Sequence, residues 1–306
     1  MATMYAFFKG DFVPLSEAKI GILTHAFNYG TAVFEGIRGY WNEDEQQLYA
    51  FKLTEHYQRL RNSCHILNIN LRYSVKELCE ITTELLRRSE VRSNIYIRPI
   101  AYKSGEVLGV RLHNIDDDVT IACLPFGKYV EAEAAHCKVS SWRRMDDSIA
   151  PVRAKITGIY VNSALAKTEA VLDGYDEAIL LNGDGHVSEG SGENIFLVRN
   201  GVLITPARSE NILEGITRDV VIQLAREVLG MSVEERAVDR SELYVADECF
   251  LTGTAAEVTV VGKIDHRQIG TGKIGPYTTR LRQAFEDVAY GRNKKYISFC
   301  TPVWPK

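Results

Sequence analysis

Residues 187–196 place two glutamates and several small residues at a point where the chain enters a β-sheet. The Asn-Gly-Asp-Gly sequence at 182–185 is typical of a hairpin turn, and the apolar run at 195–198 indicates a buried strand. Glu189 and Glu193 are therefore expected beside a sheet. Such carboxylates belong either to an active site or to a glycine-rich surface turn that exposes them to water.

Composition narrows the class of partner. The chain has 306 residues, of which 45% are hydrophobic and 25% charged, as in a soluble globular protein with one large or two medium domains. A formal net charge of -4 and an isoelectric point near 6.0 argue against nucleic-acid or anionic-membrane partners. A small soluble ligand is the expected partner.

Other sequence features bear on location and on metals. No apolar run reaches the roughly 18 residues that suggest a membrane-spanning helix, and the first residues lack the pattern of a secretory leader. We therefore expect a cytoplasmic protein. The six cysteines form no Cys-x-x-Cys pair and the seven histidines show no ligand spacing, so neither a disulfide framework nor a metal site is expected.

Residues 1–125 are expected to form a small N-terminal α/β domain. Apolar residues at steps of three and four predict a helix capped by Thr54, and the spacing of Ser74 and Glu77 predicts a capping box on a second helix. Alternation along a later strand places Tyr96 and Arg98 on one face. The predicted elements are a hairpin over 5–13, helices over 53–67 and 74–88, and strands over 94–102 and 118–126.

Apolar patterning lapses over residues 126–135, which we interpret as an interdomain linker. It resumes in a larger α+β domain expected over 136–306. The predicted elements of this domain are helices over 159–172, 217–229 and 276–288, strands over 177–181, 193–198, 249–252 and 257–261, and a hairpin turn over 199–201.

Four further segments could carry chemistry. At 213–218 a glycine leads directly into a helix, so the amides of Ile216 and Thr217 could bind a phosphate or simply begin an ordinary helix. Residues 252–257 form a second turn of small residues with accessible donors. Residues 28–38 suit a pocket wall and equally a bent sheet edge. Lys155 lies among apolar residues, where partial burial would ease its deprotonation, although most lysines are exposed.

Taken together, these segments resemble the class IV aminotransferases of the fold-type IV pyridoxal-phosphate group, and the branched-chain-amino-acid aminotransferases in particular. The resemblance spans nearly the whole chain, and five motifs occur in family order with family-like spacing. The motifs are residues 27–30 with 34–38, 96–99, 188–190 with 193–196, 215–218, and 253–257.

The resemblance implies an α+β, two-domain fold like that of D-amino-acid aminotransferase, with the cofactor at the domain interface and the cofactor-binding lysine in the larger domain. It also implies an enzyme that exchanges the amino group between leucine, isoleucine or valine and 2-oxoglutarate by a ping-pong mechanism. The partners implied are amino acids and 2-oxo acids.

A cofactor role is implied for each matching residue. Lys155 would hold pyridoxal 5′-phosphate as an internal aldimine and then shuttle the proton between substrate and cofactor. Glu189 would keep the pyridine nitrogen protonated, and Tyr160 would bind the phenolic oxygen. The phosphate cup and its surroundings would comprise Arg59, Leu213, Ile216, Thr217 and Thr254.

Substrate roles follow from the same resemblance. The α-carboxylate would meet Tyr96 and the small-residue turn at 254–256. Arg98 would supply donors for the γ-carboxylate of glutamate, which is costly to bury unpaired, whereas a strand-face ion pair is the alternative for this arginine. The implied substrate-binding residues are Tyr29, Phe34, Arg38, Tyr96, Arg98, Tyr129, Thr254, Ala255 and Ala256.

Two positions depart from the bacterial pattern: Phe126 stands where many relatives carry tryptophan, and Leu108 where methionine is common. In the family the loop with Leu108 and Val110 reaches the neighbouring subunit's site, which implies a homodimer or a larger homo-oligomer. Activity toward D-amino acids or R-amines, which relatives of the same fold show, is the alternative specificity. A ligand-binding module without cofactor is disfavoured because Lys155 and Glu189 are both present.

Overall fold

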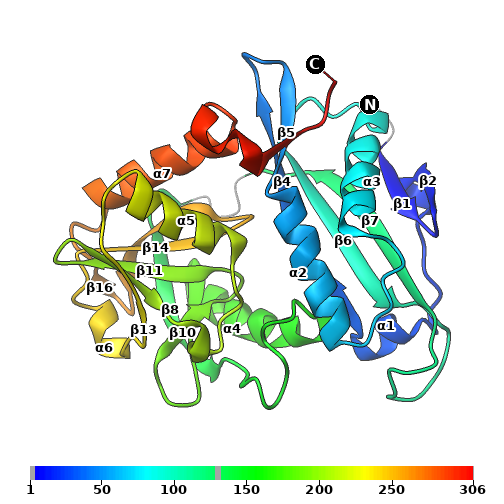
Figure 1. Cartoon of the computed structure of the whole chain (residues 1–306). Coiled ribbons are helices and arrows are strands. Elements are labelled where there is room, and N and C mark those ends of the chain that lie inside the picture. The colour runs from blue at the N-terminus through cyan, green and yellow to red at the C-terminus, as the bar shows by residue number, and fades with distance from the viewer. Residues whose placement is uncertain (1–3, 128–131, 306) are drawn as a thin grey trace. The chain divides into compact units, whose positions relative to one another are not determined.

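The computed structural model describes residues 4–127 and 132–305. The chain forms two compact units (Figure 1). The first comprises Met1–Gly127, Ala154–Ile159 and Asp287–Lys306, and the second comprises Lys128–Arg153 and Tyr160–Glu286.

These units differ from the linear division expected from the sequence. Residues 128–131 of the predicted linker lie outside the described residues, and the segment Ala154–Ile159, with Lys155, groups with the N-terminal residues. Backbone contacts explain this grouping, because Ile156 forms a β-bridge with Val33 and the Phe34 amide donates to the Lys155 carbonyl at 3.0 Å.

The first unit is built on an antiparallel sheet of eight described strands, in the order β17-β5-β4-β6-β7-β1-β2, with β3 beside β6. The alternation predicted for the central strand is confirmed, since Ile95 and Ile97 are buried while Tyr96 and Arg98 are only partly buried. The strands are β1 (Tyr5–Phe8), β2 (Asp11–Pro14), β3 (Ala32–Phe34), β4 (Ile37–Asn42), β5 (Gln47–Phe51), β6 (Ile95–Lys103), β7 (Asp117–Pro125) and β17 (Cys300–Pro302).

Two long helices, α2 (Leu53–Ile66) and α3 (Val75–Arg88), lie across one face of this sheet (Figure 1). The predicted capping box of α3 is confirmed: Ser74 Oγ accepts from the Glu77 amide, and the Glu77 carboxylate accepts from the Ser74 amide. The predicted cap Thr54 is wrong, because Lys52 precedes the helix in the left-handed conformation and α2 already begins at Leu53. The shorter helical segments are α1 (His25–Tyr29), η1 (Leu15–Glu17), η2 (Thr157–Ile159) and η4 (Lys294–Phe299).

The second unit contains a mixed sheet of nine described strands, in the order β10-β9-β8-β15-β14-β11-β12-β13, with β16 beside β15. The strands are β8 (Ala135–Arg143), β9 (Glu177–Leu181), β10 (Val187–Gly190), β11 (Asn194–Arg199), β12 (Val202–Pro206), β13 (Val233–Arg236), β14 (Glu248–Gly253), β15 (Glu257–Ile264) and β16 (Arg267–Gln268). The helical segments are α4 (Tyr160–Leu172), η3 (Arg208–Glu210), α5 (Ile216–Glu227), α6 (Arg240–Leu243) and α7 (Pro276–Ala289), the last of which ends in the first unit.

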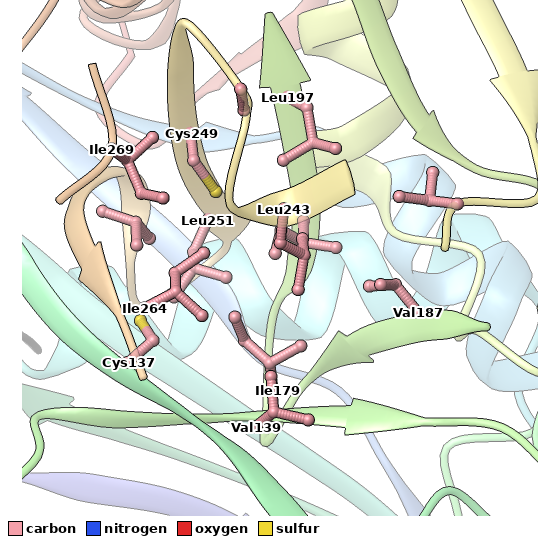
Figure 2. Packing of buried hydrophobic residues seen from close by; sticks show 14 of the residues in the cluster. Cys137, Val139, Ile179, Val187, Leu197, Leu243, Cys249, Leu251, Ile264 and Ile269 are labelled. Atoms are coloured by element: carbon pink, nitrogen blue, oxygen red, sulfur yellow. The ribbon is translucent and has the colours of Figure 1, made fainter. Parts of the chain in front are cut away.

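The strand predicted after the two glutamates is β11, and both of its faces are buried. Ile195 and Leu197 belong to an apolar cluster contributed mainly by β8, β9, β11, β14 and β15, part of which is shown in Figure 2. On the opposite face Phe196 stacks on Phe250, with ring centres 5.1 Å apart. Each such buried side chain stabilises the fold by about 1.5–3 kcal/mol, so β11 is a rigid support for the glutamate segment.

The six cysteines are free, and all but Cys79 are buried. Within residues 4–127 and 132–305, no helix is both long and apolar enough to span a membrane.

Candidate active site

Lys155 is fixed at its backbone and partly buried, which is the first of the two alternatives that its apolar surroundings left open. Its amide donates to Ser63 Oγ of α2 at 3.2 Å, and its carbonyl accepts from the Phe34 amide. The Lys155 Nζ lies 4.9 Å from the centre of the Phe34 ring. The amine is therefore held against an aromatic face by two elements of the first unit.

A buried ionic cluster lies next to this lysine in the first unit. Glu35, which follows β3, is fully buried and accepts hydrogen bonds of 2.7 Å from Arg59 Nε, Arg59 Nη2 and His56 Nδ1. Arg59 was expected from the sequence, whereas Glu35 and His56 were not identified as functional. Glu35 lies within one of the quoted motifs, but its partners in α2 could be found only from tertiary structure.

The neighbouring charges and burial determine the pKa values of Glu35 and His56. Burial alone would raise the pKa of Glu35, but the charge and hydrogen bonds of Arg59, together with His56, lower that pKa to about 2. Burial lowers the pKa of His56, and the charges of Arg59 and Lys155 lower it further, against the opposing effect of Glu35. An ionised Glu35 can only accept, so His56 carries its proton on Nδ1.

Arg98 on β6 has an aromatic environment. Its guanidinium lies 4.7 Å from the centre of the Phe34 ring and 5.2 Å from that of Tyr96, and its Nη2 donates to the Tyr96 hydroxyl at 2.9 Å. Arg98 Nε is buried without a hydrogen-bond partner among the described residues. The ion pair that was the alternative for Arg98 is therefore not formed within that part of the chain.

The remaining predicted wall residues gather around Tyr96. Arg38 and Tyr96 are register partners on β4 and β6, so their side chains lie on the same face. The Phe126 ring packs 5.0 Å from Tyr96 and 5.2 Å from the Arg38 guanidinium. A side chain at Gly36 would collide with the Tyr96 hydroxyl, which explains why this position is glycine.

Tyr29 contacts a different predicted segment. Its hydroxyl accepts from the Gly109 amide at 3.0 Å, and buried His25 contacts the Gly109 carbonyl through Nε2 at 2.8 Å. Leu108 and Val110 on either side are 69% and 84% exposed. Tyr29 thus helps to position the loop that presents these two apolar side chains. Tyr129 lies outside the described residues.

Glu189 is the centre of the second unit's polar network. One carboxylate oxygen lies 2.9 Å from Arg144 Nη2, and the other accepts from Asn194 Nδ2 at 3.1 Å and from the Leu213 amide at 2.9 Å. The register of β10 shifts between Val187 and Glu189, an irregularity of the kind that redirects side chains near active sites. Glu189 is therefore buried and held from three sides.

The predicted phosphate cradle lies beside this network. Gly215 precedes α5 without a side-chain cap, so the first amides of the helix, at Ile216 and Thr217, have no intrahelical acceptor. Asn194 Nδ2 also donates to the Leu213 carbonyl at 2.9 Å, and a side chain at Gly215 would collide with Asn194 Oδ1. Asn194 therefore couples Glu189 to the start of α5.

The second unit also contains the predicted turn at 254–256 and Tyr160. The predicted turn at 254–256 connects β14 to β15, and neighbouring Thr252 Oγ1 is buried without a hydrogen-bond partner among the described residues. Tyr160 is the first residue of α4 and is partly buried. Arg144 and Asn194 were not singled out from the sequence. Asn194 lay within a quoted motif, whereas nothing in the sequence around Arg144 indicated its partner.

Glu193 contrasts with Glu189, four residues earlier. It is buried, and its carboxylate accepts from the Gly192 amide at 3.1 Å. Burial and the charge of fully buried Glu177 raise the pKa of Glu193 well above its ordinary value, only partly opposed by Gly192 and Lys167. The structure therefore favours a neutral Glu193.

Comparison with known proteins agrees with these observations. The sequence model of the amino-transferase class IV family matches residues 32–264. The chain is 54% identical over 303 residues to a probable branched-chain-amino-acid aminotransferase of Aquifex aeolicus, covering 99% of this chain and 97% of that protein.

Two solved structures are also similar over almost the full length. The branched-chain amino acid aminotransferase of Thermobaculum terrenum in its PLP form has a TM-score of 0.95 and 41% identity, covering 99% of both chains. The branched-chain aminotransferase of the archaeon Thermoproteus uzoniensis with norvaline has a TM-score of 0.95 and 44% identity, covering 99% of this chain and 100% of that chain.

Proposed function

Because the chain belongs to the class IV aminotransferase family, we propose that it is a pyridoxal-5′-phosphate-dependent transaminase that exchanges the amino group between branched-chain L-amino acids and 2-oxoglutarate. The observation that carries the proposal is the network in which Arg144 and Asn194 hold Glu189 beside the uncapped start of α5. A buried carboxylate next to an anion cradle suits a cofactor with a basic ring nitrogen and a phosphate.

The donor set of the chain fits pyridoxal 5′-phosphate. Glu189 offers a fixed acceptor for the protonated pyridine nitrogen. The start of α5 and the guanidinium of Arg59 offer donors for a phosphate dianion. When bound, the cofactor supplies an electron-withdrawing ring that stabilises negative charge at the substrate Cα.

The chain's own residues would perform the remaining steps. Lys155 Nζ would bind the cofactor covalently and then move the proton at the substrate Cα. Its anchoring to Ser63 and Phe34 would fix where that proton is taken and delivered. Tyr160 would donate to the phenolic oxygen, and Leu213, Thr217 and Thr254 would complete the cofactor contacts.

Two kinds of substrate side chain must be accepted. Phe34 offers an apolar surface for leucine, isoleucine or valine, and Arg98 stacked on that ring offers a cation for the γ-carboxylate of glutamate. The buried Nε of Arg98, without a partner among the described residues, supports this role because a substrate carboxylate would satisfy it. Tyr96, with the turn at 254–256, would bind the α-carboxylate, and Tyr29, Arg38 and Tyr129 would line the pocket.

We also propose a homodimer or larger homo-oligomer, which the resemblance to the family supports. Exposed Leu108 and Val110, held through Gly109 by His25 and Tyr29, would reach the site of the neighbouring subunit. We also infer a cytoplasmic enzyme. The names of the relatives favour branched-chain substrates over D-amino acids or R-amines.

The function is tested by transamination between L-leucine and 2-oxoglutarate. We expect Lys155→Ala to lower the rate at least about a thousandfold, because both covalent binding and proton transfer are lost. Lys263→Ala is the matched control, since Lys263 is exposed on β15, and it should retain the wild-type rate. A Lys155→Ala protein with wild-type activity would show that the proposed role is wrong.

A further inference from the structure

Glu35 contacts both the wall around Arg98 and Tyr96 and the helix α2. Its neighbours Phe34 and Gly36 belong to the wall packed around Arg98 and Tyr96, and its own amide donates to the Pro99 carbonyl at 3.0 Å. Its carboxylate points away from solvent to α2, where it meets His56 and Arg59. Glu35 therefore joins the wall to the helix that carries Arg59.

The contact with Arg59 fixes an orientation. Glu35 Oε1 accepts from Nε and Oε2 accepts from Nη2, both at 2.7 Å, so two parallel bonds hold one edge of the planar guanidinium. His56 Nδ1 donates to Oε2 at 2.7 Å and restrains the carboxylate in turn. An arginine without such a partner would sample many rotamers and would lose that freedom on binding.

Burial is unequal across the pair. The side chain of Glu35 has no exposed surface, whereas that of Arg59 keeps 14%. A buried ion pair is weak support for stability, because an apolar pair of similar volume often stabilises a fold equally well. The arrangement is better suited to orienting a side chain: buried Glu35 holds Arg59, and the Arg59 guanidinium remains partly accessible.

We propose that Glu35 is a positioning residue for phosphate recognition, which holds the Arg59 guanidinium in the orientation that receives the cofactor phosphate, with His56 fixing the Glu35 carboxylate. This inference rests on the proposed function through the role of Arg59. The new element is that the affinity for the phosphate depends on Glu35, which does not itself contact the cofactor.

The test compares pyridoxal 5′-phosphate with pyridoxal, which lacks the phosphate. The full-length apoprotein is titrated with each compound, followed by absorbance, and the ratio of the two dissociation constants measures the phosphate preference. We expect Glu35→Gln to reduce this preference about tenfold or more, because the charge-assisted fork that orients Arg59 is lost. Binding of pyridoxal should change little.

Charge alone predicts the opposite result. Removing a negative charge behind Arg59 strengthens the local attraction for an anion, so a purely electrostatic effect would increase the phosphate preference of Glu35→Gln. An increased or unchanged preference would therefore overturn the positioning role.

A double-mutant cycle separates positioning from general damage. Arg59→Met should lose the phosphate preference, and Glu35→Gln combined with Arg59→Met should lose no more than Arg59→Met alone. Additive losses would mean that Glu35 acts independently of Arg59 and would contradict the proposal. Glu248→Gln is the matched control, because Glu248 is also buried and accepts hydrogen bonds at the start of α7, and it should keep the preference.

Two outcomes keep the inference distinct from the proposed function. If the wild-type protein binds pyridoxal 5′-phosphate no better than pyridoxal, the proposed function and this inference fail together. If the wild type shows the preference and Glu35→Gln retains it, only this inference fails. Should Glu35→Gln not fold, Glu35→Asp keeps the charge but shortens the reach, and we expect it to lose the preference as well.

Discussion

The two units hold their key charged groups in opposite ways. In the first unit a buried carboxylate, Glu35, fixes the guanidinium of Arg59 by two bonds of 2.7 Å. In the second unit a buried guanidinium, Arg144, lies 2.9 Å from the carboxylate of Glu189. In each unit, the group proposed to bind the cofactor is thus backed by a partner of opposite charge, which fixes its geometry.

Each unit also contains a charged or ionisable group without an ion pair among the described residues. Arg98 in the first unit has aromatic rings around it and a buried Nε without a partner in that part of the chain. Glu193 in the second unit accepts a hydrogen bond from the Gly192 amide and lies near a second acid, Glu177. This contrast fits the proposed roles, in which paired groups bind the cofactor and Arg98 binds a substrate carboxylate, and the raised pKa of Glu193 favours its protonated form.

Breaking the pair in the second unit has the largest expected effect. Arg144→Met leaves Glu189 buried without its cation, and loss of one partner of such a pair costs about 3–5 kcal/mol. We expect kcat for L-leucine and 2-oxoglutarate to fall about a hundredfold or more.

Arg143→Met is the control for this change, because Arg143 is the exposed neighbour of Arg144 and its side chain makes a long contact, 3.5 Å, with the Asn182 carbonyl. It should keep nearly full activity. If both variants behaved alike, the proposed support of Glu189 by Arg144 would have to be abandoned.

Substituting Arg98, whose buried Nε has no partner among the described residues, has the next largest expected effect. We expect Arg98→Ala to raise the KM for 2-oxoglutarate at least about tenfold more than the KM for L-leucine, since only the former has a second carboxylate to pair. Steady-state kinetics with each substrate varied in turn measures this ratio. Equal losses for both substrates would contradict the selectivity role, and Arg72→Ala, at a half-exposed surface ion pair with Asp118, should change neither KM.

Substituting Glu193 of the second unit has the smallest expected effect, which appears in stability. The pKa of Glu193 is raised in the folded state, so the folded protein retains a proton that the unfolded chain releases above its ordinary pKa of 4.5. Stability from this group is complete below pH 4.5 and declines, by about 1.4 kcal/mol per pH unit, until the folded pKa is passed.

Glu193→Gln removes this dependence. We expect its Tm to exceed that of the wild type at pH 9, by about 2–4 °C for each kcal/mol that the wild type loses, with little difference at pH 5. Thermal unfolding at the two pH values measures the change, and exposed Glu80→Gln on α3 serves as the control. A Tm difference independent of pH would mean that Glu193 is ionised in the folded protein.

Local signals predicted much of the fold. The capping box at Ser74 and the alternation along β6 each depend on residues close in sequence, and both are confirmed. The N-cap of α2 was misplaced because Lys52 adopts a left-handed conformation, and its amide donates to the Phe299 carbonyl, far away in the sequence. Such a constraint is not visible in the helix's own residues.

The same limit applies to the candidate site. The resemblance to the family predicted cofactor roles for Lys155, Glu189 and Arg59, although only Glu189 lies within one of the quoted motifs. The supporting residues Glu35 and Arg144 were missed, since their partners lie 24 and 45 positions away and the contacts exist only in the folded chain. Lys155 was likewise assigned to the larger domain because sequence order gives no indication that its segment packs on β3.

The central claim is tested most directly by the absorbance spectrum of the purified protein with cofactor, before and after each substrate. The account predicts a visible cofactor band that disappears when L-leucine is added alone and returns when 2-oxoglutarate follows, because the two halves of the exchange occur separately. A band unaffected by L-leucine but converted by D-alanine or an R-amine would contradict the branched-chain assignment. The absence of any band after addition of pyridoxal 5′-phosphate would contradict the account as a whole.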